Sequence, residues 1–500
     1  MNKNKIKSVV VVGGGTAGWI TASLLSKVLG KVVDITLVES DDIATIGVGE
    51  ASIPPMQPFN NALGIDESVF MSQTKATIKL GIQFEGWGKC TDSYMHAFGG
   101  IGKNFPFCDF YHYWLKARNE GFGGDFWDYS LNYQAAKAGK FSHLTNIPNT
   151  QLPGLSYAYH FDAGLYARFL RNFAEQSGVK RIEGKIKHVN QQEETGFVTE
   201  LQLEDGVQIQ GDLFVDCSGL HALLIDKTLN AGFDDWSHWL LCDRAIAIPC
   251  EHETTDIVPY TRSIAHSAGW QWQIPLQHRI GNGLVYSSRY MTDDEARKTL
   301  LNHLPGNPIG EPRFIKFRTG RVHNPWTKNV IAIGLSSGFL EPLESTSIHL
   351  IQTAAVRLIK HFPHNGISSV QVQKFNEQSR VEFERIRDFI ILHYKLNERN
   401  DSSFWRHCAQ MDVPPSLANK LTLFKDTGKL YRDDEELFTE IAWQQVLIGQ
   451  GFLPNDHHPL GEMLSKAQLQ DMFESLNTLV TETVRNLPSH NEFLKRVIRA

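Results

Sequence analysis

The first part of the chain alternates short apolar runs with a longer amphipathic stretch. Ser8–Val12 is a valine run that ends at glycines and predicts a buried strand. Thr16–Leu29 has apolar residues at helical spacing and predicts a helix, and the β-rich run Val32–Val38 predicts a second strand. A strand, a helix and a strand in this order form a βαβ unit, so we expect a parallel sheet.

The pattern changes towards the C-terminus. Further strands are predicted at Val198–Leu203, Val207–Val215 and Val330–Ile333. Apolar residues at helical spacing then predict helices at Val370–Tyr394, Leu417–Phe424, Asp433–Leu447 and Ala467–Arg485. We therefore expect an α/β domain over residues 1–365 and a mainly helical region over residues 366–500, with the boundary in the turn-rich HFPHNGISS.

Composition limits the classes of protein that fit. The chain has 500 residues, of which 42% are hydrophobic, enough to bury a large core in two or three structural units. The net charge of −6 gives no sign of a nucleic-acid or membrane-surface partner, and no stretch approaches a membrane span. Six cysteines without a C-x-x-C pair indicate reduced thiols in a cytoplasmic protein, and no metal site is evident.

A glycine motif carries the first chemical signal. Gly13, Gly15 and Gly18 form a G-x-G-x-x-G that ends a predicted strand and, with Thr16 and Ala17, opens a helix. The first glycine permits a tight turn, the second lets the backbone approach a pyrophosphate, and the third lets helix and strand pack closely. Glu39 ends the next strand, where an acid hydrogen-bonds a ribose. We expect a dinucleotide here; the alternative is a glycine-rich turn without a ligand.

A second glycine-rich turn favours FAD over NAD. The strand at Val330–Ile333 is followed by Gly334, Leu335 and Gly338, and such a late strand and turn brings a second backbone segment to the cofactor in large FAD domains. The strand and turn at Leu213–His221 end near the same place in such folds.

Three motifs together resemble a known family. They are the glycine motif followed by Trp19, the W-x-W-x-I-P pattern at Trp270–Pro275, and GFLEPLESTS at Gly338–Ser347. Over most of its length the chain resembles the flavin-dependent halogenases of the tryptophan-halogenase type. The resemblance implies that reduced FAD and oxygen form a flavin hydroperoxide, that a halide (chloride or bromide) attacks it, and that the resulting hypohalous acid travels through a tunnel to halogenate an arene. Since no NADH site is obvious, we expect a separate flavin reductase to supply the reduced FAD.

The resemblance also implies two catalytic residues. The family lysine matches Lys79 in TIKLGIQFEGW, although the alternation of its neighbours is typical of a half-buried strand with a solvated lysine. The family glutamate matches Glu344, which would take the arene proton, and Glu341 is the competing candidate. For either acid, the alternative is an interaction with the dipole at a helix N-terminus.

Two further cofactor-side elements follow from the resemblance. The family motif F-x-x-P-x-x-S-x-G matches Phe339, Pro342 and Ser345 but ends at Ser347, and the backbone N–H groups of Thr346 and Ser347 would hold the halide. GVGEASIP at Gly47–Pro54 matches the strap over FAD, with Gly49, Glu50 and Ala51 expected near the cofactor; the alternative is an ordinary surface loop.

The substrate pocket is matched only in part. His96 and Phe98 match the family's H-x-F-G, and Trp443 is a pocket candidate or a helix core residue. The family's tyrosine pair and glutamate, which hold free tryptophan, have no counterpart that we can identify. We therefore expect an indole or another electron-rich arene, free or carried on a larger molecule.

The two tryptophans at Trp270 and Trp272 have two interpretations. By pattern alone they are core residues of a strand; by resemblance they form a wall that keeps the substrate away from the flavin hydroperoxide.

Other functions stay open on the sequence alone. A flavin-dependent aromatic hydroxylase would need no remote lysine, and a flavin-dependent cyclase or reductase, or a non-catalytic flavin-binding protein, would share the nucleotide motifs. A homodimer is among the assemblies considered.

Overall fold

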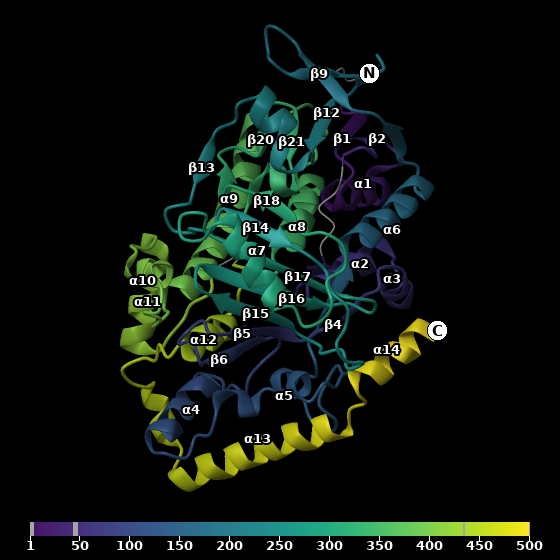
Figure 1. Cartoon of the computed structure of the whole chain (residues 1–500). Coiled ribbons are helices and arrows are strands. Elements are labelled where there is room, and N and C mark those ends of the chain that lie inside the picture. Colours follow the sequence, from purple (N-terminus) through teal and green to yellow (C-terminus); the bar gives the residue numbers. More distant parts are fainter. Residues whose placement is uncertain (1–4, 44–48, 434–435, 500) are drawn as a thin grey trace. The chain divides into compact units, whose positions relative to one another are not determined.

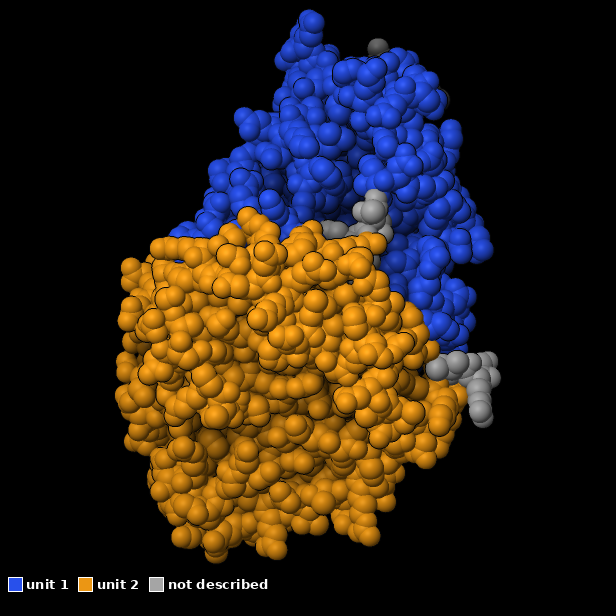
Figure 2. Space-filling view, in the orientation of Figure 1, with its two compact units in different colours: residues 1–76, 161–243, 315–384 blue, residues 77–160, 244–314, 385–500 orange. Residues whose placement is uncertain are grey.

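The valine-rich N-terminal run forms the middle of a parallel sheet in the computed structural model of the chain (Figure 1). The structure describes residues 5–43, 49–433 and 436–499. By compactness the chain divides into two units, each made of three separate segments and coloured separately in Figure 2. Unit 1 contains residues 1–76, 161–243 and 315–384, and unit 2 contains residues 77–160, 244–314 and 385–500.

Unit 1 is built on a six-stranded sheet. The strand order is β20-β21-β12-β1-β2-β8, and the register pairs β1 in parallel with both β2 and β12. The helix α1 packs beside the sheet together with α6 and α8 (Figure 1). The strands of this sheet are β1 (Ser8–Val12), β2 (Asp34–Glu39), β8 (Lys180–Glu183), β12 (Leu213–Asp216), β20 (Trp326–Thr327) and β21 (Val330–Ala332).

Smaller elements complete unit 1. Its helices are α1 (Thr16–Leu29), α2 (Met56–Leu63), α3 (Glu67–Gln73), α6 (Ala163–Gln176) and α8 (Ser347–Lys360). Its other strands are β3 (Gly49–Ala51), β9 (Ile186–Gln191), β10 (Val198–Leu203), β11 (Gln208–Gln210), β13 (Phe233–Asp235), β19 (Gly320–Val322) and β22 (Gly338–Phe339). The inner face of β1 packs Val10 and Val12 against Phe214 of β12 and Leu201 of β10, which buries one core under the parallel sheet.

Unit 2 is built on antiparallel pairs. The strands β14, β17, β16, β15, β5 and β6 lie side by side in that order, and only β15 and β5 pair in parallel. A separate antiparallel pair joins β4 to β7. The strands are β4 (Thr77–Lys79), β5 (Gly81–Glu85), β6 (Ser93–Ala97), β14 (Arg244–Ala247), β15 (Thr261–His266), β16 (Gly269–Pro275) and β17 (Ile280–Tyr286).

Helices supply most of the rest of unit 2. They are α4 (Phe110–Asn119), α5 (Leu131–Lys137), α7 (Asp293–Asn302), α10 (Ser403–Gln410), α11 (Pro415–Thr427), α12 (Glu440–Gly449), α13 (Lys466–Asn486) and α14 (His490–Arg499). Three elements contain residues of both units: β7 (Ala158–Asp162), β18 (Arg313–Lys316) and α9 (Ser369–Lys395).

The predicted elements are confirmed with local corrections. The α/β class, the βαβ start and the long helix near residue 370 are confirmed. The run Val207–Val215 forms two strands, β11 and β12, because the turn between them contains Gly211 and Asp212. The helix predicted from Asp433 begins only at Glu440, after the N-cap residue Thr439, and residues 434–435 lie outside the described part. The division of roles at residue 365 stays a prediction.

Candidate active site

The glycine motif adopts the turn that its spacing predicts. Gly13 has φ +110°, and a Cβ there would lie 2.3 Å from the carbonyl oxygen of Cys217. A Cβ at Gly18 would lie 1.8 Å from the carbonyl oxygen of Gly13, so α1 and β1 are packed as closely as backbone allows. A Cβ at Gly15 would meet nothing within 4 Å. The first and third glycines are therefore required by the chain itself, while the second faces open space beside the helix N-terminus, where a pyrophosphate fits.

The acid predicted to bind a ribose lies against this turn. Glu39 is the last residue of β2, and its Oε2 is 1.4 Å from the position that a Cβ on Gly14 would take. Its Oε1 accepts a hydrogen bond from Nε of Arg181 at 2.6 Å and lies 3.7 Å from Arg171. The carboxylate is thus held over the glycine turn, where a ribose hydroxyl could replace or share the arginine contacts. The two arginines come from β8 and α6, and no sequence pattern marked them.

Two more turns meet the glycine motif at the same edge of the sheet. Gly334, directly after β21, has φ +79°, and a Cβ there would lie 2.7 Å from Cβ of Ala17 in α1. The hydroxyl of Ser336 donates to the carbonyl oxygen of Asp216 at the end of β12. A carboxylate oxygen of Asp216 in turn accepts from the backbone N–H groups of residues 224 and 225. The carboxyl ends of β1, β12 and β21 therefore carry adjoining turns, which is the arrangement that the FAD prediction requires, and the residues present fit that cofactor.

Part of the predicted strap forms β3. Residues 47–48 of the strap lie outside the described residues, and Gly49–Ala51 is the strand. Burial raises the pKa of the Glu50 carboxyl from its usual value of 4.5 to about 7. An acid with this pKa in a short strand is half protonated near neutral pH.

The EPLEST segment places its two acids and the predicted halide residues in one turn of unit 1. Glu341 and Glu344 are both buried, at 0% and 1% exposure, so neither is the exposed helix N-terminal acid of the alternative interpretation. Ser345 has φ +58°, after which Thr346 is the N-cap residue of α8 and Ser347 its first residue. The N–H groups at a helix N-terminus attract anions, which is consistent with a halide at these two residues.

Lys79 is fully buried. Its exposed fraction is 0%, and the expectation of a solvated lysine on a half-buried strand is wrong. The Nζ lies 5.4 Å from the ring centroid of Phe98, so the ammonium contacts an aromatic face. Every residue of β4 is buried, because other parts of unit 2 cover the face that the alternation left polar.

Buried histidines support the strand that carries Lys79. The hydroxyl of Thr77 lies 3.1 Å from Nδ1 of His160 and donates to the carbonyl oxygen of Pro275 at 2.6 Å. The backbone N–H of Ile78 donates to Nε2 of His490 at 3.1 Å. Burial lowers the pKa of His160, and the charge of Lys79 lowers it further. Burial also lowers the pKa of His490, to about 4. Both imidazoles are therefore neutral near pH 7, and neither was marked by a sequence motif.

The predicted substrate residues gather around aromatic rings of unit 2. His96 lies 5.7 Å from the ring of Phe389 and 6.1 Å from that of Phe438, and Trp443 lies 4.9 Å from Phe389. Gln445 of α12 exchanges two hydrogen bonds with the backbone of residue 97, which fixes α12 against β6. The indole nitrogen of Trp443 is buried and has no hydrogen-bond partner among the described residues. Phe438 was missed by the sequence reasoning, and its place in LFTEIAW, five residues before Trp443, is the only signal for it.

Trp270 and Trp272 are buried in β16. Their exposed fractions are 1% and 8%, and their rings meet edge to face at 6.2 Å. Trp270 continues to Trp87, whose ring is 6.4 Å away. Trp272 lies across Gly283 of β17, where a Cβ would be 2.0 Å from Cζ2. The core interpretation therefore describes Trp270 well, and the role of the pair as a wall stays a prediction.

The roles of these residues stay predictions, because Lys79 belongs to unit 2 and Glu344 and the nucleotide turn belong to unit 1. Among the described residues, no group of three or more His, Cys, Asp or Glu is arranged to hold a metal ion. In the same part of the chain, the helices are too short or too polar to cross a membrane.

Comparisons with known proteins agree with this arrangement. A family model described as Tryptophan halogenase matches residues 8–466. Tryptophan 7-halogenase RebH of Lentzea aerocolonigenes is 34% identical, over 98% of this chain and 99% of its own. The solved structure of Xcc4156, a flavin-dependent halogenase from Xanthomonas campestris, is 48% identical with a TM-score of 0.96, over 99% of this chain and 98% of its own. BrvH, a flavin-dependent halogenase from Brevundimonas sp. BAL3, is 44% identical with a TM-score of 0.95, over 99% of both chains.

Proposed function

Because this chain belongs to the tryptophan halogenase family and is a flavin-dependent halogenase, we propose that it halogenates an electron-rich arene such as an indole with hypohalous acid, at Lys79 and Glu344. The observation that carries the proposal is the complete burial of Lys79 beside the ring of Phe98. A buried ammonium loses its hydration and keeps its place only where a function or a partner requires it.

The cofactor side is assigned to unit 1. FAD would lie with its pyrophosphate at Gly15 and the start of α1 and with its ribose at Glu39. Reduced FAD supplies, with oxygen, the oxidant that converts chloride or bromide into hypohalous acid. The backbone N–H groups of Thr346 and Ser347 would hold the halide, because they begin α8 and its dipole favours an anion.

Lys79 and Glu344 divide the halogenation step between them. The ammonium of Lys79 donates a hydrogen bond to the oxygen of the hypohalous acid, which makes the halogen more electrophilic. The ring carbon then forms its bond to the halogen as the oxygen–halogen bond breaks, and the oxygen leaves as water after it takes up a proton. Glu344 accepts the ring proton, which restores aromaticity.

The aromatic residues of unit 2 are proposed to hold the arene. His96, Phe98 and Trp443 offer ring faces and edges for an indole. The indole nitrogen of Trp443, buried without a partner among the described residues, offers a donor to a polar group on the substrate. Without a tyrosine pair to hold the charged ends of free tryptophan, we expect an indole, or an arene carried on a larger molecule, to bind better than the free amino acid.

Reduced FAD is proposed to come from a separate flavin reductase by diffusion. Purified protein mixed with NADH and FAD should therefore oxidise NADH only after a reductase is added, and stoichiometric oxidation without one would contradict this part.

Replacing Lys79 tests the mechanism. Lys79→Met preserves side-chain length and should leave FAD binding unchanged, while brominated indole formed with a flavin reductase, NADH, bromide and oxygen should fall about 100-fold or more. Lys103→Met removes an exposed lysine of the same unit and is the matched control. Full turnover by Lys79→Met would exclude the lysine mechanism, and a hydroxylated product instead of a brominated one would favour the monooxygenase.

A further inference from the structure

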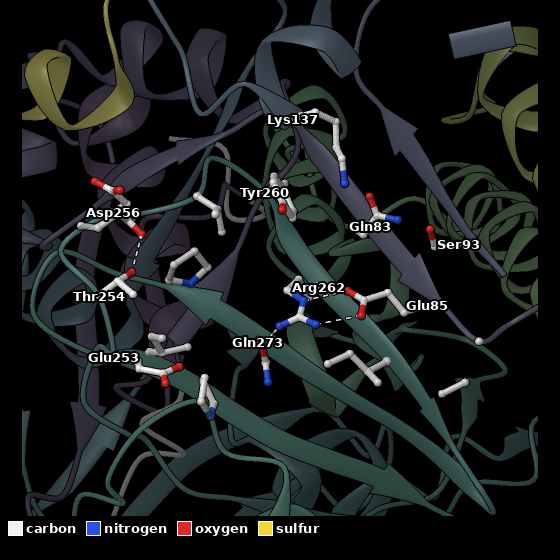
Figure 3. Close-up of a pocket in the computed structure, with 18 of the residues that line it drawn as sticks. Gln83, Glu85, Ser93, Lys137, Glu253, Thr254, Asp256, Tyr260, Arg262 and Gln273 are labelled. Carbon is white, nitrogen blue, oxygen red and sulfur yellow. Dashed lines mark hydrogen bonds and ion pairs between the residues drawn. The ribbon is translucent and has the colours of Figure 1, made fainter. Parts of the chain in front are cut away.

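A cavity of about 700 Å³ opens on the sheet of unit 2, away from all the residues assigned above (Figure 3). Its floor consists of Gln83 of β5, Arg262 of β15 and Gln273 of β16, which the strand register places side by side. Trp272 pairs with Ser263, the next residue along β15, so its side chain is on the opposite face of the sheet.

The aromatic residues assigned to the substrate are also on the opposite face. His96 pairs with Ile82, which in turn pairs with Thr261, and each of these precedes or follows a floor residue by one position. Because successive side chains of a strand point to opposite faces, the cavity is separated from the aromatic pocket by the sheet itself.

The floor of the cavity is rigid and electrically balanced. Glu85 accepts two hydrogen bonds from Arg262, at 2.7 Å from Nε and 2.8 Å from Nη2. Nη1 of the same guanidinium donates to Gln273 at 2.9 Å. The bidentate pair neutralises both charges and fixes their geometry, so the floor attracts neither ion strongly.

The rim carries an excess of negative charge. Glu253 and Asp256 lie in the loop at one side of the cavity and Asp92 at another, and none of the three forms an ion pair with a lysine or arginine in the part of the chain described. Lys137 is the cation of the rim, and its Nζ lies 5.8 Å from the ring of Tyr260. With the floor pair cancelled, three carboxylates face one ammonium, which gives the cavity a negative potential.

A buried acceptor lies at the floor. Gln83 is 5% exposed, and its amide nitrogen donates to the carbonyl oxygen of Tyr94 at 3.1 Å. Its amide oxygen is buried with no hydrogen-bond partner among the described residues, and in Figure 3 it lies on the side that faces Lys137. An acceptor of this kind costs stability unless a donor satisfies it.

We propose that this cavity is a binding site for a small organic cation, a protonated amine on an apolar body. The ammonium would lie among Glu253, Asp256 and the amide oxygen of Gln83, and the body would lie against the apolar part of the lining, which includes Ile264 and Ile280. The volume is within the range of small-molecule sites. This site goes beyond the halogenation proposed above and does not depend on it.

Three probes with one body test the charge preference. Hexylamine, hexan-1-ol and hexanoate are titrated into the full-length protein by calorimetry. We expect hexylamine to bind at least about tenfold more tightly than the alcohol, and hexanoate not to bind at about 10 mM. Equal binding of amine and alcohol, or no binding of the amine at about 10 mM, would overturn the proposal.

Matched charge variants locate the site. The double variant Glu253→Gln with Asp256→Asn changes two exposed side chains and should weaken hexylamine about tenfold. The double variant Asp471→Asn with Glu474→Gln makes the same change in net charge on the exposed face of α13 and should leave the affinity unchanged. An equal loss in both doubles would show only a general charge effect, and displacement of hexylamine by indole would place it in the aromatic pocket; either result would refute the site.

Discussion

The second glycine of the nucleotide turn allows the assignment of FAD to unit 1 to be tested without disturbing the fold. Gly15 has φ −74° and ψ −174°, values that alanine adopts readily, and a Cβ there would meet nothing within 4 Å. At Gly18 the same methyl would lie 1.8 Å from the carbonyl oxygen of Gly13. One substitution at two positions three residues apart therefore separates a loss of ligand from a loss of structure.

The expected magnitudes follow from these contacts. Gly15→Ala should change the free energy of unfolding by less than about 1 kcal/mol, since the gain from a stiffer unfolded chain is offset by a slightly poorer N-cap. Its methyl would occupy the space of the pyrophosphate and remove one or two charge-assisted hydrogen bonds, so FAD should bind about 10- to 100-fold more weakly. Gly18→Ala must move backbone and should destabilise the protein without FAD by about 3 kcal/mol or more.

Two measurements are needed. FAD is titrated into each variant while the fluorescence of the protein is followed, and thermal unfolding is recorded without FAD. Gly100→Ala, in unit 2, is the control, because a Cβ there also meets nothing within 4 Å. The reasoning is refuted if Gly15→Ala binds FAD as tightly as the parent protein, or if it unfolds as early as Gly18→Ala.

Two further predictions concern the tryptophan wall and the response to pH. Gly283→Ala should destabilise the protein by about 1–3 kcal/mol and move the ring of Trp272; if Trp272 is part of a wall, the hypohalous acid formed or the product obtained per reduced FAD falls, and unchanged single-turnover yields of both would make it packing only. Protection of residues 49–63 from hydrogen exchange should fall as the pH rises from 4.5 to about 7, because the raised pKa of Glu50 makes its ionisation in the folded protein costly, and Glu50→Gln should abolish that trend. Protection of residues 77–85 should instead fall as the pH drops from 6.5 to about 4, the pKa of His490, and parallel trends in the two peptides would contradict both assignments.

The nucleotide half of the site was predictable because its signals are local. The turn after β1 needs Gly13 at a positive φ and Gly18 against a carbonyl oxygen, so the chemistry of the turn is written in consecutive residues. The acid at Glu39 follows from the length of one helix and one strand. The arginines that hold it were not predictable, because the parallel sheet brings them from the segment after residue 160.

The surroundings of Lys79 could not be read from its neighbours. Alternation of apolar and polar residues predicts two faces of a strand, but not whether the polar face meets water or another part of the chain. Here the residue before Lys79 is hydrogen-bonded to His490, 412 positions away. The start of α12 was wrong for a related reason: the acidic residues after Asp433 have high helix propensity, and the helix nevertheless begins only after Thr439.

The neutral histidines below Lys79 explain how a buried ammonium can be held in place. His490 accepts from the N–H of Ile78 at Nε2, so its proton is on Nδ1, from which it donates to the carbonyl oxygen of Ile257 at 2.7 Å. A second proton would have to enter at Nε2 and break the bond to Ile78, next to Lys79. Burial opposes that proton, and at His160 the charge of Lys79 opposes it as well. Acid should therefore disturb the strand of Lys79 before it protonates the lysine's chemical partners, which makes the lower pH limit of halogenation a property of the fold.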